Sequence, residues 1–435
     1  MTIELTDEMR KAYDIIANSN DNVFITGKAG SGKTTFLKHL ISNVNKKFIV
    51  TAPTGVAAIN AKGVTLHSQF NIPIGFISPD TDPAKRYNKT LMEICRSFDV
   101  LVIDEISMVR PDVIDYIDRT LRMYRSSGVP FGGVQVVMLG DLFQLSPVVK
   151  QEEQKIMLNF YEGFHFFFAA VWEEKGFHIF EFTKVFRQND DRLVKMLNNI
   201  REYIFTKEDK ELLVSLRDEA TISDYNNGYV HLCSKRATVA DINDRMLGEP
   251  EVMYTSETKG EFNPSSKPCE DELKLRVGCR VMILVNDANK VYHNGSTGTV
   301  MGYDGAKVRV KLDNGLSVNI EKNTWREMEY KIVDGEVKQY EKGSFTQFPL
   351  ALAYACTIHK SQGLTFDKVA LHVGHIFSPG QLYVALSRCR TLEGIAVDSL
   401  ISKRHIIKDE QLVKFYTAIH KTGDYFNKHT LKYII

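Results

Sequence analysis

A glycine-rich loop between an apolar run and a helical stretch constrains the fold of this chain more than any other feature. The loop reads Gly27-Lys28-Ala29-Gly30-Ser31-Gly32-Lys33-Thr34. Residues 23–26 before it predict a buried strand, and residues 35–41 after it predict a helix. In this order, the backbone N–H groups of the loop and the positive helix start can surround phosphate oxygens. We therefore expect a nucleoside triphosphate site; the alternative is a glycine-rich turn that matches by chance.

Two groups of residues are expected to act on this nucleotide. Lys33 is expected to reach the β- and γ-phosphates, and the Thr34 hydroxyl to hold Mg²⁺. Farther along, residues 100–103 predict a strand that ends in Asp104 and Glu105. We expect Asp104 to bind Mg²⁺ through its water shell and Glu105 to polarise the attacking water as general base. Alone, such an acidic pair is surface charge, but its distance behind the glycine loop favours the catalytic interpretation.

Three more polar residues complete the expected set. Gln144 follows a third apolar strand at residues 134–139, where it can sense the γ-phosphate; the alternative is a polar loop before a helix. Arg187 and Arg388 each lie near the end of an element. An arginine that faces the γ-phosphate across a domain cleft stabilises transition-state charge and raises the rate by about 10³–10⁵. It also makes cleft closure depend on the nucleotide.

Composition sets limits on the class of protein. A length of 435 residues suggests roughly two to four domains. Because Lys+Arg number 55 and Asp+Glu 54, no overall basic field attracts a polyanion, although a local groove remains open. The cysteines show no CxxC spacing, so we expect neither zinc nor a disulfide framework. No basic start leads into an apolar core and no apolar run approaches the ~20 residues of a membrane span, so we expect a soluble intracellular protein.

The order of apolar runs and helical stretches predicts an α/β fold. An amphipathic helix opens the chain, capped by Thr6, with Met9, Ala12, Tyr13 and Ile16 on one face. Runs as apolar as those that follow are typical of parallel sheets covered on both faces. We expect two doubly wound domains in tandem, the second beginning near Phe180. The expected strands are residues 23–26, 48–52, 100–103, 134–139, 229–233, 350–357 and 369–373.

Two segments depart from this α/β pattern. Between about residues 272 and 345, apolar residues alternate with polar ones: Val308, Val310 and Leu312 lead to Asn314-Gly315, and Leu316, Val318 and Ile320 follow. Asn-Gly between alternating segments is a strong hairpin signal, so we predict a small antiparallel barrel inserted into the second domain. Residues 71–90 contain three prolines and no periodicity, which indicates an excursion from the first domain.

Taken in order, these segments resemble the motifs of superfamily 1B DNA helicases, closest to the Pif-type family and more distantly to RecD-like enzymes. The resemblance covers nearly the whole chain. The stretch from Glu105 to about Arg125 is similar to the Pif-family signature, and residues 294–300 to the family's SH3-like domain. The matching segments are residues 27–34, 52–58, 63–68, 104–108, 140–148, 183–188, 357–363 and 383–388.

The resemblance implies two tandem RecA-like P-loop domains with an SH3-like β-barrel insertion in the second. The implied boundaries are 1–182 for domain 1A with a wedge-type 1B excursion at about 64–90, 183–271 plus 346–412 for domain 2A, 272–345 for insertion 2B and 413–435 for a C-terminal helical segment. That last segment brings basic residues, namely Lys414, Lys421, Lys428 and Lys432.

The resemblance also implies an activity. It is that of an ATP-dependent DNA helicase, using ATP and Mg²⁺, that moves 5′ to 3′ on single-stranded DNA and unwinds duplex, with G-quadruplex DNA as a further substrate. Such enzymes act in DNA repair, recombination and telomere maintenance. The expected partners are single-stranded DNA and junctions with duplex, bound by a monomer in a bacterial-type, nucleoid-associated cytoplasmic setting. Two rivals stay open: a superfamily 1 helicase that acts on RNA, and a nucleotide-gated clamp on single strands without processive unwinding.

Site residues follow from the resemblance position by position. The catalytic residues are Lys33, Glu105, Gln144, Arg187 and Arg388. The nucleotide and its Mg²⁺ are bound by Gly27, Gly30, Ser31, Gly32, Lys33, Thr34, Thr35, Asp104 and Gly363, with Thr34 and Asp104 at the metal. The single strand is bound by Pro53, Thr54, Gly55, Thr65, His67, Phe76, Thr357, His359, Lys360 and Ser361. Small hydroxyls and backbone N–H groups suit phosphate contacts without base readout. His67 and His359 can instead be groups that support their neighbours.

Met9 departs from the family's pattern. The family usually has a glutamine after its Leu-Thr-x-Glu segment, where it recognises adenine; here Met9 follows. Because a thioether lacks the paired donor and acceptor of an amide, we expect other nucleoside triphosphates to support turnover.

In the excursion, Phe70 and Phe76 lie where related enzymes carry a small wedge; the alternative is that both rings pack under the loop.

Overall fold

The computed structural model describes residues 5–225, 227–287, 289, 291–333, 336–422 and 425–426. Lys428 and Lys432 lie outside these described residues. The chain divides into two compact units: Met1–Phe186, Glu327–Lys342 and Asp409–Ile435 form the first, and Arg187–Arg326 with Gly343–Lys408 the second. Across the described part of the chain, no helix has both the length and the apolarity needed to cross a membrane.

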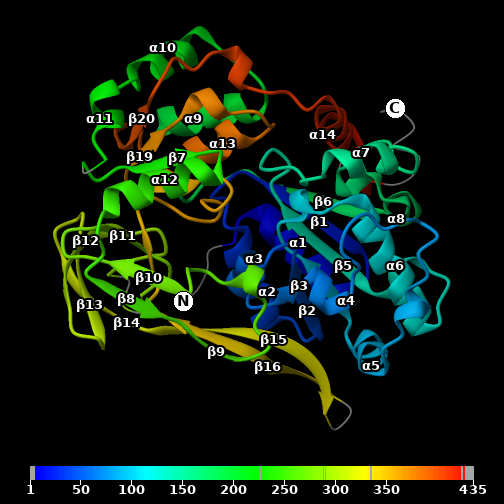
Figure 1. Cartoon of the computed structure of the whole chain (residues 1–435). Coiled ribbons are helices and arrows are strands. Elements are labelled where there is room, and N and C mark those ends of the chain that lie inside the picture. Colours follow the sequence, from blue (N-terminus) through cyan, green and yellow to red (C-terminus); the bar gives the residue numbers. More distant parts are fainter. Residues whose placement is uncertain are drawn as a thin grey trace. The chain divides into compact units, whose positions relative to one another are not determined.

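The first unit is built on a sheet with the strand order β21-β6-β1-β5-β4-β2-β3 (Figure 1). Its neighbouring strands pair in parallel, except that β21 runs antiparallel to β6. The strands are β1 (Asn22–Gly27), β2 (Phe48–Ala52), β3 (Val64–Thr65), β4 (Val100–Ile103), β5 (Gln135–Gly140), β6 (Phe177–Phe182) and β21 (Tyr425–Phe426).

The apolar character of these strands explains their place in the sheet. Every residue of β1, β4 and β5 is buried, as expected for parallel strands covered on both faces. The four strands predicted in this half of the chain are therefore confirmed. Strand β6 pairs in parallel with β1 along its whole length, so the first sheet extends to Phe182, and the second unit begins at Arg187, close to the start expected near Phe180.

Helices surround this sheet. In α1 (Asp7–Asn18), the Thr6 hydroxyl accepts the Met9 N–H, and Met9, Ala12 and Ile16 are buried, as predicted. Helix α6 (Pro111–Arg125) packs against α5 (Lys89–Ser97) and α8 (Ala170–Glu174) (Figure 1). The other helices are α2 (Lys33–Asn43), α3 (Gly55–Ala61), α4 (Leu66–Phe70), α7 (Gln151–Met157) and α14 (Glu410–Thr422), with 3₁₀ turns η1 (Pro83–Arg86), η2 (Ile106–Met108), η3 (Pro130–Gly133) and η4 (Phe166–Phe168).

The second unit contains a parallel sheet with the strand order β18-β7-β19-β20. Its strands are β7 (Val230–Cys233), β18 (Ala355–Thr357), β19 (Val369–Leu371) and β20 (Ile395–Val397). Its helices are α9 (Asp191–Arg201), α10 (Lys207–Ser215), α11 (Glu219–Ser223), α12 (Arg236–Leu247) and α13 (Gln381–Leu386), with η6 (Val373–His375), η7 (Leu392–Gly394) and η8 (Lys403–His405). Both units thus confirm the α/β class.

An antiparallel region is also present, with sheet orders β14-β13-β12-β11-β17, β10-β8 and β15-β16-β9. Its strands are β8 (Val252–Thr255), β9 (Glu257–Gly260), β10 (Glu272–Leu275), β11 (Arg280–Ile283), β12 (Thr297–Tyr303), β13 (Lys307–Leu312), β14 (Ser317–Glu321), β15 (Asn323–Val333), β16 (Glu336–Gln347) and β17 (Leu350–Leu352), with η5 (Pro264–Ser266).

The hairpin expected around Asn314-Gly315 is confirmed, since β13 and β14 pair across it and Val308 and Val310 are buried. Leu316 does not continue the alternation, because it is exposed in the turn. The single strand expected at residues 350–357 is wrong: Leu350–Leu352 pairs antiparallel with β11, whereas Ala355–Thr357 joins the parallel sheet. The SH3-like description and the four domain boundaries stay predictions.

Candidate nucleotide and DNA site

The predicted nucleotide residues of the first unit meet at one edge of its sheet. Strand β5 lies between β1 and β4, with Thr26 opposite Gly140 and Ile103 opposite Met138. The three strands run in parallel, so the loops that follow Gly27, Ile103 and Gly140 leave the same edge. In open α/β sheets, ligands bind at the carboxyl ends of the strands.

Close backbone packing explains the glycines of the phosphate loop. A Cβ on Gly27 would lie 2.7 Å from the Phe182 carbonyl oxygen and 2.9 Å from Ser31 Oγ, which no larger residue tolerates. Gly30 and Gly32 have φ angles of +78° and +85°, in the left-handed region that glycine adopts without strain. The loop therefore turns its backbone tightly just before α2.

The cation of the loop is held in place by the loop itself. Lys33 Nζ donates to the carbonyl oxygen of Gly27 at 2.7 Å and to that of Lys28 at 3.1 Å. Lys33 is the first residue of α2, and Thr34 and Thr35 follow it with exposed side chains. The ammonium and the two hydroxyls thus share the start of α2, where phosphate oxygens are favoured.

The acidic pair after β4 has unusual electrostatics. Burial, and then the neighbouring Glu105, raise the pKa of the Asp104 carboxyl to about 7; the Glu105 N–H, Lys33 and Lys38 oppose this shift. Glu105 has φ +52°, a left-handed backbone that is strained for a residue with a Cβ. Such strain persists where the surrounding structure enforces it, and it clusters at functional sites.

These residues fit a Mg²⁺ ion that arrives with a nucleotide. Asp104 is 7% exposed, so a cation would relieve the cost of its buried charge. Mg²⁺ is usually held by one or two carboxylates together with substrate phosphates and water, and the Thr34 hydroxyl adds one oxygen. In the described part of the chain, no cluster of three or more His, Cys, Asp or Glu residues is arranged to hold a metal. A Mg²⁺ ion here would be held by Asp104 and the Thr34 hydroxyl together with phosphate oxygens and water.

The loop that follows β5 is a tight turn organised by Asp141. Its carboxylate accepts the Phe143 N–H at 3.2 Å, and Gln144 Nε2 donates to Asp141 Oδ2, also at 3.2 Å. A Cβ on Gly140 would lie 2.9 Å from Ile106 Cγ2, so the turn packs directly on η2, which follows Glu105. The start of this turn thus lies against the segment that directly follows the acidic pair.

In the second unit, the two predicted arginine segments lie together. Gln188 Nε2, next to Arg187, donates to the carbonyl oxygen of Ser387 at 3.0 Å. Arg388 is 1% exposed, and its guanidinium donates to the carbonyl oxygens of Val384, at 2.8 Å, and Ser361, at 3.3 Å. Arg388 therefore links the end of α13 to the loop at residues 357–363.

The DNA residues predicted in the first unit follow β2 and β3, which are neighbours in the sheet. The side chains of Thr54 and Thr65 accept the N–H groups of Ala57 at 3.3 Å and Ser68 at 3.2 Å, which caps α3 and α4. Pro53 and Gly55 flank Thr54. The His67 side chain is exposed, yet partial burial and then Arg110 lower its pKa, with Asp112 opposing. A neutral imidazole is therefore favoured at neutral pH.

The corresponding residues of the second unit divide by exposure. Thr357 and Ser361 are buried: the Thr357 hydroxyl accepts the Lys360 N–H at 3.1 Å, and the Ser361 hydroxyl donates to the Ile358 carbonyl at 2.7 Å. Both hydroxyls shape the loop, and their contact with DNA stays a prediction. Lys360 is exposed and Gly363, with φ +81°, has open space at its Cβ position. Burial, and then Arg236, lower the pKa of His359.

Comparisons with known proteins identify the family of this chain. Residues 4–211 match the family described as PIF1-like helicase. The ATP-dependent DNA helicase Pif1 of Bdellovibrio bacteriovorus is 32% identical over 428 residues, covering 95% of this chain and 92% of that protein. The Campylobacter jejuni Pif1 is 30% identical, covering 85% and 86% of the two chains.

Solved structures give the same result. Bacteroides sp. Pif1 in complex with ADP-AlF4 superposes with a TM-score of 0.94 at 52% identity, covering 98% of this chain and all of that one. Bacteroides Pif1 bound to ssDNA gives 0.72 at 52% identity, with the same coverage. The chain belongs to the PIF1-like helicase family. It is a Pif1-type ATP-dependent DNA helicase, as the resemblance of its motifs predicted.

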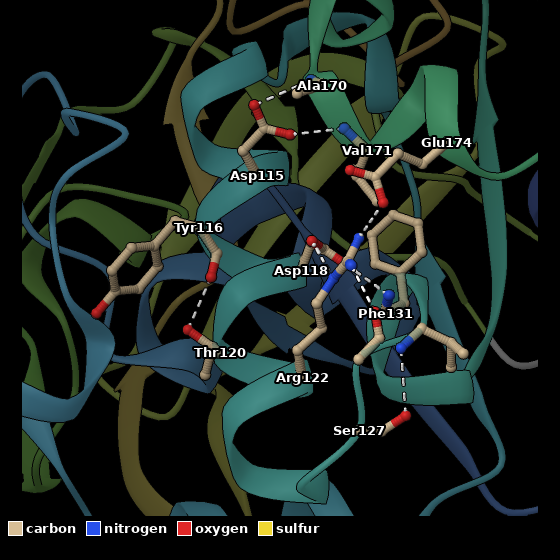
Figure 2. Close-up of polar contacts among 12 residues, drawn as sticks. Asp115, Tyr116, Asp118, Thr120, Arg122, Ser127, Phe131, Ala170, Val171 and Glu174 are labelled. Atoms are coloured by element: carbon tan, nitrogen blue, oxygen red, sulfur yellow. Dashed lines mark hydrogen bonds and ion pairs between the residues drawn. The ribbon is translucent and has the colours of Figure 1, made fainter. Parts of the chain in front are cut away.

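The stretch from Glu105 to about Arg125 includes η2 and α6, and most residues of α6 are buried in this Pif1-type helicase. Asp115 accepts the Ala170 and Val171 N–H groups, each at 3.0 Å, and Asp118 accepts the Phe131 N–H at 2.5 Å, as Figure 2 shows. Arg122 donates to Asp118 at 2.8 Å and to Glu174 at 2.7 Å (Figure 2). These side chains fasten separate segments of the first unit to one helix.

A group of contacts around Arg110, called the clamp below, lies at the start of this helix and was not predicted from the sequence. Arg110 donates to both carboxylate oxygens of Asp112, to Glu153 at 2.9 Å and to the Gly75 carbonyl at 2.5 Å, and Asp112 also accepts the Ile77 N–H. The clamp fixes the excursion to α6. The signal was present, since Asp112, Asp115 and Asp118 recur every three residues along one helix and are all buried.

The excursion places the two predicted aromatic residues differently. Phe70 is 1% exposed and belongs to the core, so for Phe70 the packing alternative is confirmed. Phe76 is half-buried and stacks on Phe160, with ring centroids 5.7 Å apart. Next to it, Ile74 is 98% exposed, and Phe160 is 49% exposed. The excursion thus presents an apolar tip to solvent.

Proposed function

We propose that this helicase couples ATP·Mg²⁺ hydrolysis at the carboxyl edge of the first sheet to 5′-to-3′ travel along single-stranded DNA. The observation that carries the proposal is the convergence of the loops after β1, β4 and β5 at that edge. The direction rests on the resemblance to superfamily 1B. The complexes of Bacteroides Pif1 with ADP-AlF4 and with ssDNA support the proposal that this chain binds a nucleotide and single-stranded DNA.

The nucleotide chemistry divides among named residues. Lys33 would leave the Gly27 carbonyl to pair with the β- and γ-phosphates. Thr34 and Asp104 would hold the Mg²⁺ ion, which would neutralise phosphate charge when bound. The backbone of the loop, with Ser31 and Thr35, surrounds the phosphates. Glu105 accepts a proton from the attacking water, and its enforced backbone conformation holds the carboxylate in place.

Further hydrogen-bond donors are needed to stabilise the charge that develops on the γ-phosphate during hydrolysis. We assign Gln144 from the first unit and Arg187 and Arg388 from the second to this contact, with Gly363 near the nucleotide. Because Arg388 also donates to the Ser361 carbonyl, a change at the phosphate would reach the loop at residues 357–363. Four of the proposed DNA contacts lie in that loop, so Arg388 would connect hydrolysis with binding of the strand.

The proposed DNA contacts follow the sugar-phosphate backbone. Pro53, Thr54, Gly55, Thr65 and His67 belong to the first unit, and Thr357, His359, Lys360 and Ser361 to the second. Of these, Lys360 carries a full charge, and the neutral histidines and hydroxyls supply hydrogen bonds without reading bases. Such a surface accepts any sequence, which a translocating motor requires.

Strand separation is assigned to the tip of the excursion. Ile74 and Phe76 are apolar groups that a terminal base pair can meet, and Arg110 keeps them attached to α6. We expect Phe76→Ala to impair unwinding more than single-strand-stimulated hydrolysis. Equal loss of both activities would show that the ring only packs against Phe160.

The direct test uses partial duplexes with either a 5′ or a 3′ single-stranded tail. The proposal expects unwinding of the 5′-tailed substrate alone, and none by Lys33→Ala. Preference for the 3′ tail would overturn the direction. Equal stimulation by RNA of the same sequence would favour the RNA-acting rival, and hydrolysis that single strands do not accelerate would favour the clamp. A folded G-quadruplex behind a 5′ tail tests that further substrate, and sedimentation on a forked junction tests binding as a monomer.

Nucleotide selectivity is a separate proposal. A Cβ on Gly32 would lie 3.4 Å from Met9 Cε and 3.6 Å from the Phe186 ring, so the loop borders an apolar pair without an amide. We propose that the base is held by apolar contact and that GTP supports turnover at a rate comparable to ATP. Met9→Gln should then raise the preference for ATP. A strict ATP preference of the unchanged protein in steady-state hydrolysis would remove the proposal.

A further inference from the structure

The C-terminal helix reaches the turn that carries Gln144. The Phe143 ring is 3% exposed and meets the Tyr416 ring of α14 edge-to-face, with centroids 4.8 Å apart and an interplanar angle of 81°. Edge-to-face contacts of this kind are attractive and directional. Asp141 already holds the Phe143 N–H and the Gln144 amide, so the position of Phe143 and that of Gln144 are set together.

The same tyrosine is anchored to the strand beside the phosphate loop. Tyr416 Oη donates to the Glu181 carboxylate, 3.2 Å from Oε1 and 3.1 Å from Oε2. Glu181 lies on β6 directly opposite Thr26, the residue that precedes Gly27. His420, one helical turn farther along α14, lies 3.1 Å from the same carboxylate. Through one side chain, α14 therefore contacts both β6 and the turn after β5.

A second set of contacts fixes α14 independently of that turn. The Phe415 ring stacks on Phe167 with centroids 4.0 Å apart and an interplanar angle of 5°. His165 Nε2 lies 2.7 Å from Asp409 Oδ2, just before the helix begins. The helix is thus attached by Phe415 on one side, while Tyr416 faces the catalytic edge.

We propose that Tyr416 is a positioning residue for ATP hydrolysis, which holds the turn at residues 141–145 so that Gln144 meets the γ-phosphate. The inference rests on the proposed contact of Gln144. It gives the C-terminal segment, which follows the last strand of the second unit, a role in the chemistry of the first. The Tyr416 ring supports Phe143, and its hydroxyl ties this support to the strand that borders the phosphate loop.

The test measures nucleotide affinities and kinetic constants of the full-length chain. With Tyr416→Ala, we expect affinity for ADP–aluminium fluoride, a mimic of the transferring phosphate, to fall about tenfold while ADP affinity changes less than about twofold. The kcat of DNA-stimulated hydrolysis should fall to a similar extent, with little change in KM. Tyr416→Phe keeps the ring on Phe143 and should restore most of the loss.

Matched variants separate this role from helix stability. Thr417→Ala, at an exposed neighbouring position, should behave as the unchanged protein. Phe415→Leu loosens the helix without touching the turn; if it reproduces the selective loss, the positioning role is overturned. Circular dichroism shows whether each variant is folded, and a Phe143→Leu variant provides the same test from the other side of the contact if Tyr416→Ala fails to fold.

Gln144→Ala distinguishes failure of this inference from failure of the proposed function. If Gln144→Ala leaves affinity for ADP–aluminium fluoride unchanged, the γ-phosphate contact itself is wrong. If Gln144→Ala weakens that affinity and Tyr416→Ala does not, only the positioning role is wrong. When both act through one contact, the double variant should lose no more than Gln144→Ala alone.

Discussion

Two buried acidic regions of the first unit use the same side chains for different purposes. At the catalytic edge, burial and Glu105 raise the pKa of Asp104 to about 7. On α6, burial also raises the pKa of Asp115 and Asp118; backbone N–H groups oppose this shift for Asp115, and Arg122 and then the Phe131 N–H oppose it for Asp118. We propose that the charge of Asp104 is left for a bound cation to neutralise, whereas Asp115 and Asp118 are compensated by hydrogen bonds within the fold. Burial of an acid therefore indicates function only when its partners are counted.

The largest expected effect lies at the catalytic edge. Glu105→Gln should retain ATP binding and folding but lower kcat by about 10²–10⁴, because the general base is lost. Steady-state hydrolysis with single-stranded DNA measures this, with Glu152→Gln on the exposed face of α7 as the matched control. A variant that retains more than a tenth of the activity would remove Glu105 from its role and weaken the contrast between the regions.

On α6 the expected effect is on stability instead. Asp115→Ala leaves the Ala170 and Val171 N–H groups without their acceptor, at a cost of about 2–5 kcal/mol in the free energy of unfolding. Urea unfolding measures the loss, and Asp80→Ala, which removes an exposed carboxylate, should change little. A neutral result for Asp115→Ala would mean that water replaces the carboxylate and that α6 does not fasten α8.

A buried titratable group of the second unit, His231, is kept neutral, which adds a third case to the comparison. Burial, and then His372, lower the pKa of His231 to about 3; its Nδ1 lies 3.0 Å from His372 Nε2, and Tyr225 stacks on its ring. His372 in turn lies 3.3 Å from Asp398. In the unfolded chain the pKa of His231 is about 6.5, so below this pH the unfolded chain binds a proton that folded His231 does not bind. The stability that neutral His231 contributes is therefore present above about pH 6.5 and is lost as the pH falls toward 3.

Because of His231, the free energy of unfolding should fall by about 1.4 kcal/mol for each pH unit below about pH 6. Urea unfolding between pH 7 and pH 5 measures the slope, and His231→Gln should flatten it because the amide does not titrate. An equal slope in both proteins would mean that His231 is protonated in the folded state.

The smallest expected effect concerns the clamp at the start of α6. Arg110→Lys keeps the charge but loses the paired donors that Asp112 and the Gly75 carbonyl accept. We expect unwinding to fall about threefold while single-strand-stimulated hydrolysis stays within about twofold. Arg10→Lys on the exposed face of α1 is the control. Equal loss of both activities would indicate that the clamp supports the whole first unit rather than the excursion.

Much of this arrangement could be predicted from local sequence. Strand β1, the phosphate loop and Asp104 follow from apolar runs, glycine spacing and charge within a few residues. The pairing partner of β6 could not be predicted, because the run Phe177–Phe182 shows only that the strand is apolar, and its pairing with β1 is visible only in the structure. Residues 350–357 form one apolar run whose two halves pair with different sheets.

The contacts that support the site depend on residues far apart in the chain. The Arg110 clamp joins Gly75 and Glu153, and Tyr416 meets Phe143 across most of the sequence. Neither set of contacts can be recognised in a single sequence, because nothing there distinguishes an exposed arginine from one that binds several distant partners. The left-handed backbone of Glu105 is likewise visible only in the structure.

The most direct test compares Asp104→Asn with Asp115→Asn in one experiment. The measurement is ATP turnover per folded molecule, with saturating Mg²⁺, ATP and single-stranded DNA, alongside urea unfolding. We predict that Asp104→Asn loses about a hundredfold or more in turnover with its stability intact, while Asp115→Asn loses stability but keeps turnover within about threefold. If Asp104→Asn hydrolyses ATP normally, or if both variants lose turnover and stability alike, the division between the two buried acidic regions is contradicted.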